Sequence, residues 1–213
     1  MAFTEKQNRL PHRDLGEDYV HLVYRTFDSL PQRVAEEFWR KHQIELLTIR
    51  QSPTLAPESI MCFEQRATER AQKKFHRLSA KFRKGKGLLH RIECKRVVID
   101  SWKFLADKGD LELIAVCVMN NHVHVLIGGG TNLVDLPELM HRHKTFTAVK
   151  CNKLLGRKGK FWAYDFFDRD LRPGTFHQVL SYILNNPVAA RSVQHWTEYP
   201  GVYLTEELVG KYT

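Results

Sequence analysis

The spacing of apolar residues along the chain predicts a mixture of strands and helices. Aromatic and β-branched residues dominate Asp18–Phe27, a continuous apolar run covers Leu111–Met119, and a second run follows at His122–Ile127, all typical of strands. The aromatic-rich stretch Lys160–Leu171 is predicted to be a further strand or an extended segment. Apolar residues at helical spacing predict helices over 31–47, 58–84, 88–106, 135–155 and 175–186, with a last helical turn at 205–209.

The order of these elements favours the α+β class. A strand is followed by helices, then by two strands joined through a tight polar turn at Asn120-Asn121, and then by helix, strand and helix. This order predicts a ferredoxin-like antiparallel sheet with helices on one side. We expect a single domain over residues 1–213, with a basic helical insertion at about 50–106.

The charge of the chain is strongly basic and localised. The formal net charge is +9 and the pI is about 9.4. Between Arg66 and Arg96, Lys and Arg far outnumber the acidic residues Glu69 and Glu93, so the rest of the chain is almost neutral. Such a segment is either a solvated helix face or an arm that contacts phosphates. The composition therefore favours a polyanionic partner.

The cysteines and the N-terminus indicate the compartment. Cys62, Cys94, Cys117 and Cys151 form no CxxC pair and no disulfide framework, which favours reduced thiols in a cytosol. The chain has no apolar N-terminal segment and no run of the length that crosses a membrane. We expect a cytoplasmic protein with no membrane partner.

A histidine pair interrupts the second apolar run. His122 and His124 are two residues apart, so on a strand both side chains point to the same face. Two imidazoles on one face are either satisfied side chains of a half-exposed strand or part of a metal site, which needs a further ligand. The wholly apolar neighbours and the short polar turn favour the metal site.

A second polar pair lies about sixty residues later. Tyr182 and Asn186 are spaced i and i+4 on a predicted helix and therefore share a face. Asn186 carries an amide oxygen that can bind a metal, and Tyr182 carries a phenol that can act as a nucleophile. Taken singly, each residue is also ordinary, since Tyr is common on amphipathic helices and Asn-Pro is a common helix end.

Together these segments give the chain a family resemblance. It resembles the HUH endonucleases with a single tyrosine, and within them the REP-associated tyrosine transposases, relatives of the IS200/IS605 transposases. The His-Val-His pair followed by Tyr-Ile-Leu-Asn-Asn-Pro is the specific part of this resemblance. Asn120 departs from the family, which commonly has Pro at that place, and the helical insertion is longer than in compact members. Four segments carry the resemblance: 19–31, 118–127, 161–172 and 182–190.

The resemblance implies a mechanism and a substrate. His122, His124 and Asn186 would hold one divalent ion, Mg or Mn, and Tyr182 would attack a phosphodiester to form a 5′-phosphotyrosine bond. The implied substrate is single-stranded DNA that carries a short hairpin. The implied assembly is a monomer or a homodimer.

Basic side chains are the candidates for DNA binding. The helix after the histidine strand also carries His141 and His143, so that some of its charges could lie beside the site, whereas Phe146 and Val149 are expected to face the core. Trp162, Tyr164 and Phe167 are expected to be core residues, although one of them could stack on a base. The DNA-binding candidates are Arg66, Arg70, Lys73, Lys74, Arg77, Lys81, Arg142, Lys144, Lys150, Arg169 and Arg172.

Two other functions fit the same motifs. One is a rolling-circle replication initiator or relaxase, but those initiators often place Lys three residues after the tyrosine, where this chain has Asn185. The other is a non-catalytic DNA-binding regulator with the same fold, which the presence of all four candidate active-site residues disfavours.

Overall fold

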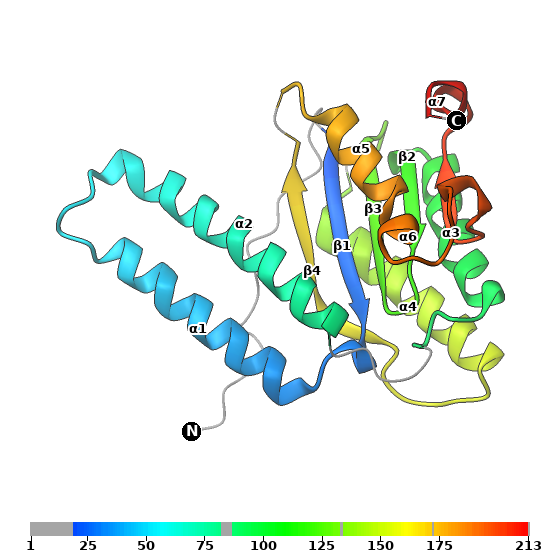
Figure 1. The fold of residues 1–213 in the computed structure, drawn as a ribbon, viewed down its shortest axis with the longest axis horizontal. Helices are drawn as coiled ribbons and strands as arrows, with labels where there is room; N and C mark the ends of the chain where they lie inside the picture. Colours follow the sequence, from blue (N-terminus) through cyan, green and yellow to red (C-terminus); the bar gives the residue numbers. More distant parts are fainter. Residues whose placement is uncertain (1–18, 82–86, 133, 172, 213) are drawn as a thin grey trace. The chain divides into compact units, whose positions relative to one another are not determined.

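The computed structural model describes residues 19–81, 87–132, 134–171 and 173–212. The chain divides into two compact units. The described part of the first, here called the helical unit, covers residues 29–81, and that of the second, the sheet unit, covers residues 19–28 and the described residues from 87 to 212. Figure 1 shows both units in colours that follow the sequence.

The helical unit consists of two long helices, α1 (Gln32–Arg50) and α2 (Pro57–Lys81), which run antiparallel (Figure 1). Aromatic rings hold them together: Phe75 on α2 lies 5.0 Å from Phe38 and 4.9 Å from Trp39 on α1, measured between ring centroids. Such aromatic contacts add to the apolar area that each ring buries. Both helices were predicted from the sequence.

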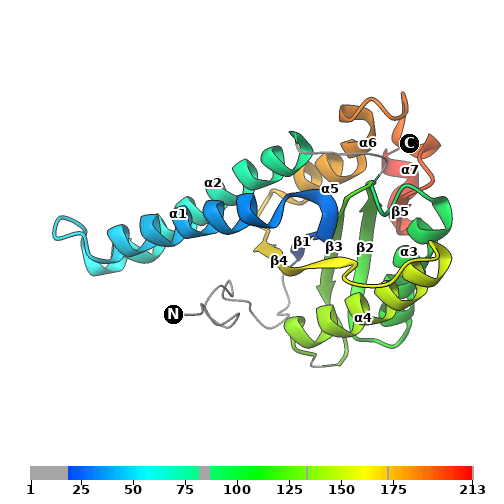
Figure 2. The same ribbon diagram turned by 90° about the horizontal axis from the view of Figure 1, so that it is seen from below.

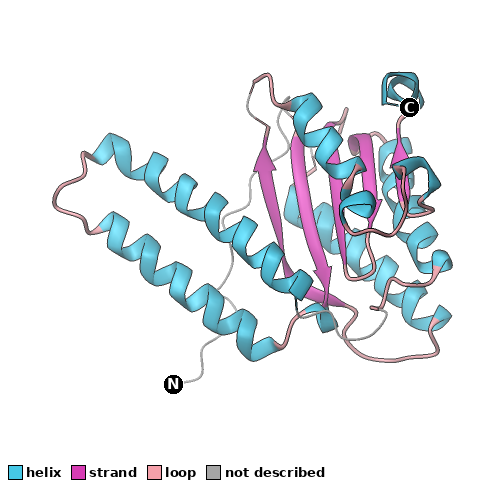
Figure 3. Cartoon of the chain, in the orientation of Figure 1, coloured by secondary structure: helices cyan, strands magenta, loops and turns pink. Residues whose placement is uncertain are grey.

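The sheet unit is built on five antiparallel strands in the order β4-β1-β3-β2-β5. The predicted α+β class and antiparallel sheet are confirmed, and Figure 3 shows the strands in magenta among the helices. The short fifth strand lies near the end of the chain, where the sequence analysis predicted only a last helical turn. The strands are β1 (Val20–Thr26), β2 (Leu111–Val118), β3 (His122–Gly129), β4 (Trp162–Asp170) and β5 (Val202–Leu204).

Helices cover both faces of this sheet. α3 (Ile92–Asp107) and α4 (Leu136–Leu154) pack on one face, as predicted, while α5 (Phe176–Leu184) packs on the other (Figure 2). The prediction that all helices lie on one side is therefore wrong for α5. The physical reason lies in β2 and β3, whose side chains are buried on both faces, so that each face needs a cover.

The remaining described elements are short. α6 (Asn186–Ala189) follows α5 directly, and α7 (Glu206–Tyr212) contains the helical turn predicted near the end of the chain. Two 3-10 turns lie at Phe27–Ser29 and Trp196–Glu198. Within the described ranges, no helix is both long enough and apolar enough to cross a membrane.

The two units divide the segment at about 50–106 in which the sequence predicts a basic helical insertion. α2 lies in the helical unit, and the extent of the insertion stays a prediction. α3 belongs to the sheet unit, because Val98, Trp102 and Leu105 on one of its faces are buried in the sheet core. An amphipathic helix packs where its apolar stripe finds a partner, and here the partner is the sheet.

A polar network joins the helices of the sheet core. His143 on α4 is buried, and its Nε2 lies 2.7 Å from the Tyr24 hydroxyl while its Nδ1 lies 2.9 Å from the Ser101 hydroxyl. Trp102 Nε1 donates to the same Tyr24 hydroxyl at 2.9 Å. Burial lowers the pKa of His143 to about 3, so this histidine is a neutral core residue rather than one of the charges of α4.

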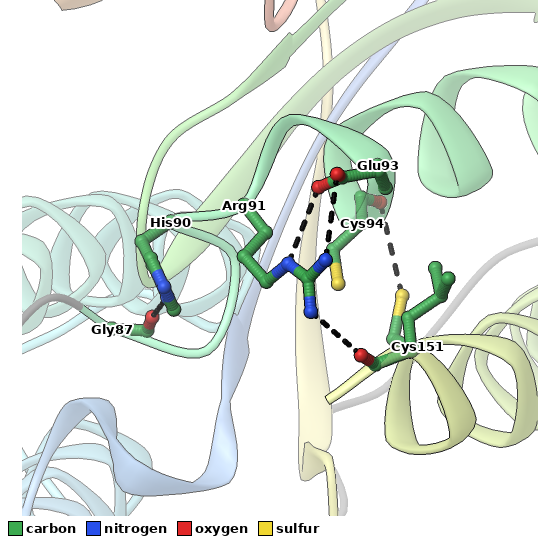
Figure 4. Close-up of polar contacts among 7 residues, drawn as sticks. Gly87, His90, Arg91, Glu93, Cys94 and Cys151 are labelled. Carbon is green, nitrogen blue, oxygen red and sulfur yellow. Dashed lines mark hydrogen bonds and ion pairs between the residues drawn. The ribbon is translucent and has the colours of Figure 1, made fainter. Parts of the chain in front are cut away.

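Arg91 fastens the end of α4 to the start of α3. Its Nη1 donates to the Leu154 carbonyl at 2.8 Å, and its guanidinium also contacts the Glu93 carboxylate (Figure 4). Beside this contact the Cys151 thiol faces the Cys94 carbonyl, and both thiols are free and buried. A guanidinium that satisfies a terminal helix carbonyl stabilises the end of that helix.

His143 makes the stability of the sheet unit sensitive to acid. In the unfolded chain the pKa of His143 is close to 6.5, whereas in the folded protein it is about 3. Between these two pH values the unfolded state binds a proton that the folded state does not bind. This one group should therefore lower the free energy of unfolding by about 2 kcal/mol between pH 7 and pH 5. Urea unfolding of the wild type and of His143→Gln at both pH values measures it. An equal loss in both proteins would contradict the assignment.

Candidate functional site

The paired histidines face α5. Along β3, Val123 and Val125 pack in the cluster with α3 and α4, whereas Leu126 packs in the cluster with α5. Because side chains of a strand alternate, His122 and His124 share the face of Leu126. The prediction that both imidazoles point to one face is confirmed by this alternation.

His124 is held by a third histidine. Its side chain is 1% exposed, and its Nδ1 lies 3.1 Å from Nε2 of His21 on β1. The two rings are stacked, with centroids 5.3 Å apart and planes 22° apart. The ring of His122 meets that of His124 edge to face at 5.1 Å. Three imidazoles therefore lie side by side on this face.

His122 is oriented by the residue before it. Its Nδ1 lies 2.7 Å from the side-chain oxygen Oδ1 of Asn121. An amide oxygen can only accept a hydrogen bond, so Nδ1 carries the proton and Nε2 keeps the lone pair. Thr26 fixes Asn121 in turn, because its backbone N–H and its hydroxyl both donate to the Asn121 carbonyl, at 2.9 Å and 3.1 Å.

A buried lysine holds the turn between β2 and β3. Lys95 Nζ donates to the Val118 carbonyl at 3.0 Å, to Asn120 Oδ1 at 3.0 Å and to the Tyr199 hydroxyl at 2.7 Å. Burial lowers the pKa of Lys95 to about 8. Asn120, which stands where the family commonly has proline, thus contributes an acceptor that proline lacks. Lys95 lies in the basic stretch of the sequence, yet it is a core residue.

Tyr182 on α5 lies over the histidines. Its ring centroid is 5.6 Å from that of His124 and 6.2 Å from that of His21, edge to face in both cases. Val179 and Ile183 fix α5 by packing against the sheet, and Tyr182 lies at the edge of this packed side, where its ring meets the histidines. The side chain is 49% exposed, so its hydroxyl can meet a ligand from solvent. The sequence alone cannot show that the histidine strand and this helix meet, and the ring distances place Tyr182 beside His124.

Asn186 stands at the start of α6, one turn after Tyr182. Its Nδ2 donates to the Tyr182 carbonyl at 2.8 Å, which leaves the amide oxygen Oδ1 as the atom that can bind an ion. The Nε2 atoms of His122 and His124 are both buried. Two imidazole nitrogens and an amide oxygen fit one divalent ion with its remaining positions left to water and phosphate. Among the described residues, no cluster of three His, Cys, Asp or Glu side chains offers a different metal site.

The candidate DNA-binding residues of the helical unit are mostly on its surface. Arg66, Lys74 and Arg77 are exposed on α2. Arg70 is also exposed and pairs with Glu45 of α1 at 3.0 Å. The side chains of Lys73 and Lys81 lie outside the described part of the structure.

The candidates on α4 have different surroundings. Arg142 forms an ion pair with Asp110 at 3.1 Å, and Lys144 Nζ donates to the carbonyls of Ala163 and Tyr164 at 3.2 and 3.0 Å. Lys150 is exposed. α4 lies on the sheet face opposite the histidine pair. The expectation that some charges of α4 lie beside the site is therefore wrong.

Phe146 and Val149 are on the surface of α4, not in the core as predicted. They are 49% and 65% exposed, and Lys150 Nζ lies 5.7 Å from the Phe146 ring centroid. The inward face of this helix is taken by Leu139, Met140 and other residues of the core cluster. The apolar character of a helix residue alone therefore does not predict that it is buried.

The face of the histidine pair also carries residues from β1 and β4. Tyr24 and Leu22 belong to the opposite cluster, so His21 and Arg25 point to the α5 face. Arg25 pairs in register with His122, and Arg169 on β4 pairs with His21. Arg172, the last candidate, lies outside the described residues. Trp162 is buried as expected, Phe167 is half-buried, and Tyr164 is 59% exposed.

Sequence reasoning missed His21 and Arg25 as parts of the site. Both lie in a stretch of alternating apolar residues, and their alternation with Leu22 and Tyr24 is the only signal that the sequence holds. The alternation shows that His21 and Arg25 share one face of their strand, but not which strand lies beside it. The register of β1 against β3 supplies the missing information.

A solved structure shares this fold. A REP-associated tyrosine transposase bound to a REP hairpin aligns with a TM-score of 0.51 and 11% identity, over 96% of this chain and 87% of that chain. A candidate transposase from Deinococcus radiodurans R1 aligns with a TM-score of 0.34 and 17% identity, over 84% of this chain and 96% of that chain, which is too loose to define a common fold. No curated protein matches the sequence.

Residues 83–186, just under half of the chain, match the family model described as "Transposase IS200 like", and this segment contains the histidine pair, Tyr182 and Asn186. Over this segment the chain is similar to the IS200-like transposases. The match and the shared fold support a transposase-like, DNA-processing role.

Two lysines of α4 allow a test of which charges contact DNA. Lys144→Met removes an ammonium that donates to two carbonyls, and should lower the free energy of unfolding by about 1–2 kcal/mol without changing the salt dependence of DNA binding. Lys150→Met should leave stability within about 0.5 kcal/mol and reduce the salt slope by roughly 0.7–0.9. Binding isotherms at several salt concentrations, with urea unfolding, measure both. A reduced salt slope in Lys144→Met at unchanged stability would reverse this assignment.

Proposed function

We propose that the protein is a metal-dependent endonuclease and strand transferase that acts on single-stranded DNA carrying a hairpin, in the manner of REP-associated tyrosine transposases. One observation carries the proposal: the ring of Tyr182 lies 5.6 Å from that of His124, although about sixty residues separate the two in the sequence. A potential nucleophile and a potential metal ligand thus share one surface. The family match over the same segment supports it.

His122, His124 and Asn186 would hold one divalent ion, Mg or Mn, through the two Nε2 atoms and Oδ1. When bound, the ion would polarise the scissile phosphate and stabilise the charge that develops on it. The chain supplies the fixed frame: Asn121 Oδ1 and His21 Nε2 lie against the Nδ1 atoms of the two rings, at 2.7 and 3.1 Å. Each ring therefore presents its other nitrogen to the site.

Tyr182 would carry out the covalent step. Its Oη attacks the phosphorus, the P–Oη bond forms, and the bond from phosphorus to the 3′ oxygen breaks. The phenol gives up its proton and the departing oxygen takes one up, so the products are a 5′-phosphotyrosine and a free 3′-OH. Because the phosphodiester energy is kept in the new bond, a later 3′-OH can attack it and rejoin the DNA.

The substrate and the setting follow from charge and family. Exposed Arg66, Lys74 and Arg77 of α2 are suited to phosphate contacts that depend on salt. Arg169, on the face of the histidine pair, would contact the strand being cut. The hairpin is proposed because the REP-associated relative was solved with one. We propose action in the cytoplasm, by a monomer or a homodimer.

Tyr182→Phe tests the nucleophile. The purified protein is incubated with Mn²⁺ and hairpin DNA that carries its label on the 3′ side of the scissile phosphate, and the products are separated on a denaturing protein gel. The wild type should give a covalent protein–DNA band that disappears in Tyr182→Phe, because the attacking oxygen is gone. Tyr164→Phe is the matched control, since Tyr164 is also an exposed tyrosine of the sheet unit and should leave the band unchanged.

The outcomes separate the competing functions. Cleavage that persists in Tyr182→Phe would exclude Tyr182 as the nucleophile. Tight hairpin binding without any covalent band in the wild type would instead indicate a non-catalytic DNA-binding regulator.

His124→Ala tests the metal site. The substitution removes one of the two imidazole ligands, so we expect loss of the covalent band by at least two orders of magnitude, with hairpin affinity kept within about threefold. Gel-shift titration without metal measures the affinity. A parallel loss of hairpin binding and of the cooperative unfolding transition would show that His124 serves the fold instead.

A further inference from the structure

His21 contacts His124, and the mechanism proposed above gives it no chemical step of its own. It comes from β1, far from β3 in the sequence, and its Nε2 lies 3.1 Å from His124 Nδ1. Its ring is stacked on that of His124 and meets that of Tyr182 edge to face at 6.2 Å. It therefore touches both a proposed ligand and the proposed nucleophile.

We propose that His21 is a positioning residue that fixes the tautomer and the ring orientation of His124. A neutral imidazole has one N–H and one lone pair, so His124 can offer Nε2 to an ion only when its proton is on Nδ1. His21 Nε2 accepts that proton in a hydrogen bond. This proposal rests on the function proposed above.

The contact between the rings excludes His21 as a further ligand through Nε2. A nitrogen that shares a proton with His124 Nδ1 has no lone pair left for an ion. In agreement, the described residues contain no cluster of three His, Cys, Asp or Glu side chains suited to a metal. His21 thus acts on the site through His124 and not directly on its ion.

His122 offers an independent parallel. Its Nδ1 donates to Asn121 Oδ1, an atom that can only accept, and this leaves Nε2 with the lone pair. Two acceptors of different chemistry, an amide in the β2–β3 turn and an imidazole on β1, therefore impose the same tautomer on both rings. Acceptors of this kind commonly raise metal affinity by 10- to 100-fold.

The experiment compares two substitutions of His21. His21→Phe keeps a ring to stack on His124 but removes the acceptor, whereas His21→Gln keeps a side-chain oxygen that can accept. We expect Mn²⁺ binding, followed by the electron paramagnetic resonance signal of free Mn²⁺, to be about 10- to 100-fold weaker in His21→Phe and within a few-fold of wild type in His21→Gln. His90→Phe, a change at an exposed histidine outside the site, should bind Mn²⁺ like the wild type.

A second measurement does not depend on a metal. In ¹⁵N-labelled protein free of metal, the ring nitrogen signals of His124 should report a proton on Nδ1 in the wild type and in His21→Gln, and a mixture of tautomers in His21→Phe. Unchanged His124 signals and unchanged Mn²⁺ affinity in His21→Phe would overturn the proposal. Equal weakening in both variants would also overturn it, because the acceptor would then not be the acting group.

Failure of the proposed function gives a different pattern. If the wild type neither binds Mn²⁺ nor forms the Tyr182 adduct, the endonuclease assignment fails, while the ring nitrogen signals still decide whether His21 sets the tautomer of His124. Hairpin affinity should be the same in all three variants, since none of the changes removes a positive charge from the DNA-binding candidates.

Discussion

Antiparallel pairing of β1 with β3 is the constraint on which the site depends. The register sets Arg25 opposite His122 and Val23 opposite His124, and it brings the ring of His21 against that of His124. A slip of one residue would turn every side chain of β1 to the other face of the sheet. Tyr24 would then leave its bond to His143, and His21 would leave its bond to His124. The core network and the site therefore stabilise the same register.

The apolar character of β2 and β3 on both faces determines where the nucleophile can be. α3 and α4 cover one face, so the other face needs a helix, and α5 supplies it with Val179, Leu180 and Ile183. The helix that completes the core thereby carries Tyr182 to the histidine strand. The packed side of α5 fixes the position of Tyr182, which lies at the edge of that side and stays half exposed. Core packing and the proposed chemistry thus use adjacent residues of one helix.

The sequence was sufficient for most of the helices and strands, and for the shared faces of the candidate site residues. His-x-His on a strand and Tyr-x-x-x-Asn on a helix have spacings that give a common face without any knowledge of the fold. His21 could not be recognised in this way, because its partner is set by strand register. The second covering helix was open to prediction, since continuous apolar runs at 111–119 and 122–127 are typical of strands buried on both faces.

On α4, residue type alone did not predict which side chains are buried and which are exposed. His143 and His141 are two residues apart, yet His143 is buried against Tyr24 and Ser101 while His141 is exposed. Phe146 and Val149 are exposed because Leu139, Met140 and their neighbours already fill the space against the sheet. A helix with apolar residues around most of its circumference can bury only one stripe, and the sequence alone does not say which stripe meets the sheet.

The contrast in exposure between His124 and Tyr182 suits the roles proposed for them. His124 is 1% exposed and lies against His21 on another strand, and an ion site needs ligands that do not move. Tyr182 is 49% exposed, and a tyrosine that acts on DNA must be reached by the strand from solvent and released again. A buried tyrosine could not meet such a substrate. Exposed histidines would not be held in one ring orientation by their neighbours. The division of the site between a central strand and a surface helix satisfies both requirements.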